Sequence, residues 1–122
     1  MSLPLFVMED LKLRTRDYAL RIIKLYSVLP KTVEAQVVGK QFLRSGTSVG
    51  AHYRESRFAK SDADFISKTE SALQELEETS YWLELLDAMR LFPPDKLAPI
   101  RSETGELIAI FVTIVKKVKS RK

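Results

Sequence analysis

Residues 108–115, IAIFVTIV, decide the fold class of this 122-residue chain. By propensity alone, β-branched and aromatic residues of this kind favour a strand. No other segment offers a second strand, and an isolated strand would leave its backbone groups without hydrogen-bond partners. A stripe with helical spacing also runs through the segment and beyond both of its ends, at Ile100, Thr104, Leu107, Phe111, Ile114 and Val118. We therefore predict a helix here, and an all-α protein.

Three similar stripes precede this helix, each with residues three or four positions apart. Pro30 and the pair Pro93-Pro94 end helices, while Thr32 and Ser61 are suited to cap the helices that follow them. The spacing predicts helices over about residues 9–29, 32–59, 62–91 and 95–119 of one domain that spans residues 1–122. Because short connections make consecutive helices neighbours, we expect an antiparallel up-down-up-down four-helix bundle.

Composition excludes several classes of protein. The chain has no Cys, which excludes disulfides, thiolate metal sites and cysteine nucleophiles. The nearly apolar run at residues 107–115 is half the length that a membrane-spanning helix needs. The short apolar stretch at residues 3–8 is not preceded by the basic residues of a signal peptide. We expect a soluble, cytoplasmic protein with no membrane partner.

Charge is segregated along the chain. Residues 1–60 carry 11 Lys and Arg against 5 Asp and Glu, residues 61–95 carry 2 against 9, and residues 96–122 carry 7 against 2. One interpretation is an acidic helix packed between basic neighbours, and another is a basic face that contacts phosphate. The candidate nucleic-acid contacts lie in the first helix and the tail: Lys12, Arg14, Arg16, Arg21, Lys24, Lys116, Lys117, Lys119, Arg121 and Lys122.

Apolar residues exceed what one small bundle needs. Residues 107–115 are apolar around nearly the whole circumference of the predicted helix, and a second stripe of Leu13, Leu20 and Ile23 lies off the main seam of the first helix. Scattered surface Leu and Ile are normal, but contiguous apolar coverage usually marks an interface. The pattern therefore predicts self-association.

Three glycines, Gly39, Gly46 and Gly50, lie on one side of the predicted second helix. Each destabilises a helix by roughly 0.5–1 kcal/mol relative to Ala. We interpret them as the place where a neighbouring helix approaches closely. A bare backbone that receives a ligand is the alternative.

Residues 41–51, QFLRSGTSVGA, followed by Arg54 and Glu55, resemble the bacterial four helix bundle protein family, also called the 23S rRNA intervening-sequence protein family. A second similar block begins with residues 64–68, DFISK. An Asn that is common in the first block is His52 here, which casts doubt on any role that needs a side-chain amide. The positions that carry the resemblance are Arg44, Ser48, Gly50, Glu55, Lys68, Glu75, Glu78 and Trp82.

The resemblance implies a left-handed antiparallel bundle that assembles into a homo-oligomer, typically a ring of five. It implies no catalytic residue and no cofactor. A related branch comprises the accessory proteins of diversity-generating retroelements, which resemble this chain in fold. That branch implies an alternative, in which basic surfaces engage RNA or DNA together with a partner protein.

No complete catalytic or metal motif is present in the sequence. Glu75 and Glu78 share a helix face, but the one His, His52, lacks the Glu three residues before it that a di-iron bundle requires. Neither a GxxxxGK[ST] phosphate loop nor a Gly-x-Ser-x-Gly elbow occurs. We expect a non-enzymatic oligomeric scaffold or interaction protein, with nucleic-acid binding as the alternative.

The polar side of the second helix suggests a network between helices. Arg44, Ser48 and Glu55 lie in line, and Glu75 and Glu78 are placed to face Arg44 across the bundle. We interpret this set as a buried polar network that specifies helix register. Trp82 is interpreted as a large core or interface anchor, with a base-stacking platform as the alternative.

Overall fold

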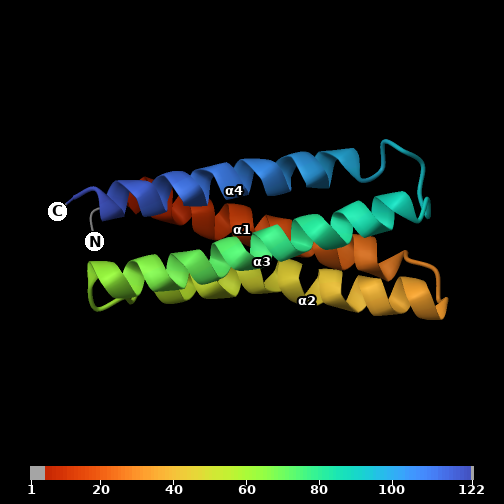
Figure 1. Cartoon of the computed structure of the whole chain (residues 1–122), viewed down its shortest axis with the longest axis horizontal. Helices are drawn as coiled ribbons and strands as arrows, with labels where there is room; N and C mark the ends of the chain where they lie inside the picture. Colours follow the sequence, from red (N-terminus) through yellow and green to blue (C-terminus); the bar gives the residue numbers. More distant parts are fainter. Residues whose placement is uncertain (1–4, 122) are drawn as a thin grey trace.

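A computed structural model describes residues 5–121, and the side chains of residues 7–121. These residues form four helices: α1 (Leu5–Ser27), α2 (Val33–Ser56), α3 (Asp62–Ala88) and α4 (Ala98–Lys119). No strand occurs within this range. The helices lie side by side and alternate in direction, so the predicted all-α antiparallel bundle is confirmed (Figure 1). Residues 1–4 and 122 of the predicted domain, Lys122 included, lie outside the described residues.

The helix ends differ from the predicted ones by up to four residues. The first helix begins at Leu5 rather than residue 9 and ends at Ser27. The third helix ends at Ala88 because Arg90 adopts a φ of 55°, in the left-handed region that stops a helix. The predicted end at residue 91 is too late because the half-buried Leu91 and Phe92 extend the apolar pattern beyond the helix, into the connection to α4.

Both predicted N-caps are confirmed. The Thr32 side chain accepts a hydrogen bond of 3.3 Å from the Ala35 backbone N–H, and the Ser61 side chain accepts one of 3.1 Å from the Asp64 N–H. Each hydroxyl satisfies one of the N–H groups that the first turn of a helix leaves without a partner.

The core follows the predicted stripes closely. Every stripe residue of α4 is buried, and so is every stripe residue of α3, from Phe65 to Leu86.

The core also contains hydroxyl groups that hydrogen-bond to each other. The Tyr18 O–H lies 2.7 Å from Thr104 Oγ1, which itself donates to the Ile100 carbonyl, so Tyr18 is the donor.

The glycines of α2 allow α1 to approach closely, as the first interpretation holds. A Cβ on Gly46 would lie 2.8 Å from two side-chain carbons of Ile22, and one on Gly50 would lie 3.2 Å from the Thr15 hydroxyl. These distances are shorter than ordinary van der Waals contact. The glycine side of α2 is therefore filled by α1.

The apolar run at residues 107–115 is largely covered within the single chain. Leu107, Phe111, Ile114 and Val115 are buried, and the remaining large apolar side chains of the run are half-buried. The apolar run of α4 is therefore less exposed than its sequence suggests, because the fold of the single chain already covers most of it. The second stripe of α1 is different, since its three residues are exposed. No helix within the described part of the chain is long and apolar enough to cross a membrane.

Candidate functional site

Arg14, one of the candidate nucleic-acid contacts, is held by carboxylates of α4. Its Nε and Nη2 donate to the two carboxylate oxygens of Glu103 at 2.7 Å each, and Nη2 also lies 2.8 Å from Glu106. The hydrogen bond to Glu103 raises the pKa of Arg14 above its ordinary value, and the same bond lowers the pKa of Glu103. Arg14 therefore ties α1 to α4.

Three other candidate contacts are also paired. Lys119 Nζ lies 3.3 Å from Glu70, Arg121 lies 3.3 Å from Asp62, and Arg16 lies 3.4 Å from Asp17. The first two pairs join the acidic α3 to the basic end of α4, which fits the interpretation that charge segregation reflects packing. Within residues 7–121, the candidates that make no ion pair are Lys12, Arg21, Lys24, Lys116 and Lys117.

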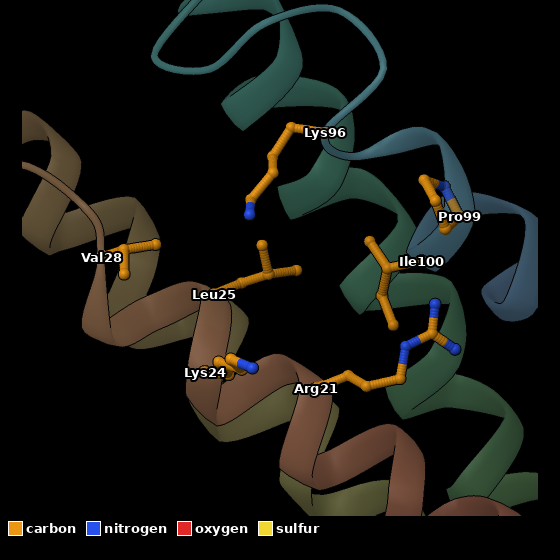
Figure 2. A pocket seen from close by; sticks show the side chains of 7 residues that line it. All are labelled: Arg21, Lys24, Leu25, Val28, Lys96, Pro99 and Ile100. Atoms are coloured by element: carbon orange, nitrogen blue, oxygen red, sulfur yellow. The ribbon is translucent and has the colours of Figure 1, made fainter.

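Two of these cations border a pocket of about 250 Å³ between α1 and the start of α4. Arg21 and Lys24 lie on α1, and Lys96 extends toward them from the connection that precedes α4 (Figure 2). The other lining residues are apolar: Leu25, Val28, Pro99 and Ile100. The result is an apolar hollow bordered by three positive charges, which suits an apolar group flanked by anions.

Sequence reasoning missed Lys96 and the pocket itself. Leu25 follows Ile22 by three residues and precedes Leu29 by four, which predicts a core position in the first helix, yet it is only half-buried because it lines the pocket. The signal available in the sequence is weak. Lys96 follows Pro93-Pro94, so its place relative to α1 depends on how the connection folds over the end of the bundle.

The second group of predicted site residues meets between α2 and α3. Arg44 pairs with Glu78 and, at 3.3 Å, with Glu75, as the sequence predicts. His52 Nε2 lies 3.3 Å from Glu75, and the Trp82 indole N–H donates to Glu78 at 3.1 Å. One guanidinium thus joins two carboxylates that in turn contact the imidazole and the indole.

This network is not buried, contrary to the interpretation from sequence. The Arg44 side chain is 48% exposed and Glu78 38%, while Glu75 is 16% exposed. The reason is position: Arg44 and Glu78 lie at the edge of the contact between α2 and α3, where solvent reaches their side chains. Trp82 is half-buried and packs at the margin of the core.

The other family-like positions have local roles. The Ser48 hydroxyl bonds the Arg44 carbonyl within α2, and Glu55 lies 3.7 Å from His52 Nδ1. Lys68 pairs with Asp64 one turn earlier on α3, at 4.0 Å. Gly50 faces Thr15 of α1 rather than the Arg44 network. Only part of the motif is therefore brought together.

Glu75 and Glu78 do share a face, but both turn toward Arg44. Across residues 7–121, no three His, Asp or Glu side chains are grouped as the ligands of a metal ion would be. What the described groups can do is recognise anions at the pocket of α1 and α4, and hold α2 against α3 through the Arg44 network.

Comparison with known proteins gives three results. The family model described as 23S rRNA-intervening sequence protein matches residues 10–113. The chain is also similar to a crystal structure of a protein of unknown function from the S23 ribosomal protein family of Bacteroides thetaiotaomicron VPI-5482. The two are 38% identical with a TM-score of 0.82, over 89% of this chain and 97% of that one. No curated protein matches the chain.

Proposed function

The chain belongs to the 23S rRNA-intervening sequence protein family, and on that premise we propose that it is a non-enzymatic, homo-oligomeric scaffold and interaction protein of the cytoplasm. The proposal includes a closed ring, for which the family resemblance favours five subunits. It assigns no cofactor and no catalytic residue.

The observation that carries the proposal is the outward face of α1. Leu13 and Leu20 are seven residues apart and so share one face, and their side chains are 48% and 55% exposed. Ile23, on the flank of that face, is 45% exposed. The buried stripe of α1 lies on the opposite side of the helix. Single exposed Leu or Ile residues are normal, but three large apolar side chains that adjoin on the outward face of one helix favour an interface.

Sedimentation equilibrium at micromolar concentration tests the proposal. We expect a mass that is a multiple of 14.0 kDa. Leu20→Glu is expected to dissociate the assembly while the helical circular dichroism is kept. The matched control is Val37→Glu, which adds the same charge at a 61% exposed apolar position of α2. A wild-type mass near that of one chain would contradict the proposal.

Nucleic-acid binding is the second candidate function. The observation that favours it is the set of cations without an ion pair within the described range, Lys12, Arg21 and Lys24 on α1 and Lys116 and Lys117 on α4. In an assembly these charges repeat by symmetry, which strengthens a weak patch. The binding would be largely independent of sequence, because phosphate contacts carry no base information.

Filter binding of structured RNA and duplex DNA across a salt series tests this candidate. Each phosphate contact is expected to add about −0.9 to the log–log salt slope on duplex DNA and about −0.7 on single strands. Lys117→Gln is expected to weaken binding uniformly. Lys119→Gln is the matched control, because Lys119 is already paired with Glu70. Absence of retention of either nucleic acid at low salt would contradict this candidate.

A further inference from the structure

The outward surface of α3 is complementary to the pocket between α1 and α4 in both polarity and charge. Glu77, Tyr81 and Glu84 step by four and three residues, so they form one outward stripe, here called the acidic face. Tyr81 is 52% exposed, although its ring lies against Trp82 with centroids 5.1 Å apart. Within the described chain, Glu77 and Glu84 make no ion pair. The acidic face is thus an aromatic ring between two unpaired carboxylates.

Most other acidic groups of α3 are already paired. Glu70, Glu75, Glu78 and Asp87 each contact an Arg, Lys or His of α2 or α4, and Asp62 contacts Arg121, just after α4. Packing of the acidic helix between basic neighbours therefore accounts for these five carboxylates. It leaves Glu77 and Glu84 unexplained, just as it leaves Arg21, Lys24 and Lys96 unexplained on the other side of the molecule.

The two surfaces lie at the same end of the bundle but on different sides of it. The first and third helices of an up-down-up-down bundle run in the same direction, so the last turns of α1 and α3 are at one end (Figure 1). The start of α4 is there too, since Arg101 and Asp87 are 3.0 Å apart. Copies with their long axes nearly aligned would therefore need only a modest axial offset to bring the acidic face of one subunit to the pocket of the next.

We propose that the pocket between α1 and α4 receives the acidic face of α3 from a second copy of this chain. Tyr81 fills the apolar hollow over Leu25, Val28 and Ile100, and the flanking carboxylates meet Arg21, Lys24 and Lys96 at its border. An aromatic anchor in an apolar pocket, with complementary charge at the rim, is the arrangement in which interfaces gain affinity at the centre and specificity at the edge.

The geometry of such a contact limits the assembly. The two surfaces are different patches of one subunit, so the contact is heterologous, and repetition of it closes a ring or extends a filament. The exposed Leu20 and Lys24 lie on neighbouring parts of the α1 surface, which makes this interface continuous with the apolar face discussed above. The inference rests on the proposed self-assembly and deepens it by naming both halves of the interface.

Charge reversal tests the pairing. The acid-reversed variant is Glu77→Lys with Glu84→Lys, the base-reversed variant is Arg21→Glu with Lys24→Glu, and a third variant combines all four changes. Each two-residue variant places like charges across the interface, which should raise the dissociation constant of the assembly by about tenfold or more. The combined variant restores opposite charges and is expected to recover the assembly. An equimolar mixture of the two variants is expected to form mixed pairs, because each carries the complement of the other, but not a closed ring of five, because an odd ring cannot alternate two variants and would keep one like-charged contact.

The matched control is Lys40→Glu with Arg54→Glu, which makes the same charge change on the exposed surface of α2. Circular dichroism shows whether each variant is folded, and sedimentation equilibrium gives its mass. Tyr81→Ala is expected to weaken assembly more than Tyr81→Phe, because the ring rather than the hydroxyl fills the pocket.

The possible outcomes distinguish a failure of the proposed interface from a failure of the proposed self-assembly. An oligomeric wild type whose mass is unchanged by both charge reversals overturns the interface and leaves the proposed function standing. Equal loss of assembly in the α2 control also overturns it, since net charge would then be the cause. A monomeric wild type overturns the proposed function and the interface together.

Discussion

Arg14 and Glu103, which are 89 residues apart in the sequence, are joined by two hydrogen bonds of 2.7 Å between α1 and α4. These helices contact each other much less than the other neighbouring pairs do. The Glu103 carboxylate is 16% exposed and Arg14 is 28% exposed, so solvent screens the pair only in part. The bidentate geometry also fixes the relative offset of the two helices.

The first prediction concerns the pH dependence of this pair. The hydrogen bond from Arg14 lowers the pKa of Glu103, so the folded state favours the carboxylate. Its stabilisation is therefore complete above the ordinary value of 4.5 and is lost as pH falls through the lowered pKa. Glu103→Gln should reduce the free energy of unfolding by about 1–2 kcal/mol at pH 7, and by less at pH 3. Urea unfolding at both pH values measures this.

Glu106→Gln is the control for that measurement, because Glu106 is 61% exposed and makes a single contact with Arg14. Its effect at pH 7 should be smaller. If Glu103→Gln reduced the free energy of unfolding equally at pH 3 and pH 7, the ionised Glu103 carboxylate would not be the source of the stabilisation.

A second prediction compares two glycines. A Cβ on Gly46 would lie 2.8 Å from Ile22, whereas one on Gly105 would have nothing within 4 Å. Gly46→Ala should therefore destabilise the protein by about 1–3 kcal/mol through overpacking. Gly105→Ala should stabilise it by roughly 0.4–1 kcal/mol, because the unfolded chain loses freedom and the folded helix loses nothing. The midpoints of chemical denaturation measure both changes. A stability change of the same sign in the two variants would contradict the close contact at Gly46.

Gly50 supplies the third prediction. A Cβ at this position would lie 3.2 Å from the Thr15 hydroxyl and 3.6 Å from the Thr15 carbonyl oxygen, so a large side chain has no room. Gly50→Leu should destabilise the fold by about 1–3 kcal/mol or separate α1 from α2. The same denaturation assay measures it. A stabilised Leu variant would mean that α1 does not cover this side of α2.

The fourth prediction concerns the buried Tyr18. Burial raises the pKa of Tyr18 to about 12, above its ordinary value of 10.0. The contribution of the neutral phenol to stability is therefore full below pH 10 and is lost as pH rises through about 12. Tyr18→Phe removes the bond to Thr104, which should cost about 1 kcal/mol at pH 8.

The decline in stability between pH 8 and pH 11 should be shallower in Tyr18→Phe than in the wild type. Some decline should persist, because burial also raises the pKa of Tyr53 to about 12. Urea midpoints at the two pH values give the comparison. A decline as steep as that of the wild type would exclude Tyr18 as a cause.

The fifth prediction tests the Arg44 network. Arg44→Gln leaves the carboxylates of Glu75 and Glu78 side by side without their shared guanidinium, so the free energy of unfolding should fall by up to about 1 kcal/mol. The loss should shrink at high salt, which screens the repulsion. Trp82 is the single tryptophan and bonds Glu78, so its fluorescence should change as well.

Arg54→Gln is the matched control for this change, since Arg54 lies on the same helix, is exposed and makes no ion pair in the described range. It should leave both stability and Trp82 fluorescence unchanged. An Arg44→Gln loss that does not depend on salt would indicate packing rather than charge as the role of Arg44.

Some contacts of the candidate site can be predicted from the sequence pattern, whereas the exposure and the grouping of its side chains cannot. The pairing of Arg44 with Glu75 and Glu78 is predictable because each residue lies at the edge of a seam, and adjacent seams must face each other. Its exposure is not predictable, since that depends on how deeply the two helices interlock. For the basic residues of α1, sequence cannot separate Arg14 from Arg21, although one is paired and the other borders a pocket.

The sequence by itself determined the four helices, the N-caps of α2 and α3 and most of the residues that face the core, because helix periodicity and capping act over a few residues. It also indicated that a neighbouring helix approaches the glycine side of α2, and the structure identifies that helix as α1. Only the tertiary structure decided that Glu103 holds Arg14, that α4 hides its apolar run, and that Lys96 joins Arg21 and Lys24 around a pocket. These outcomes depend on the rotation and axial offset of helices that are far apart in sequence. Many distant contacts set those two quantities jointly, and no local pattern contains them.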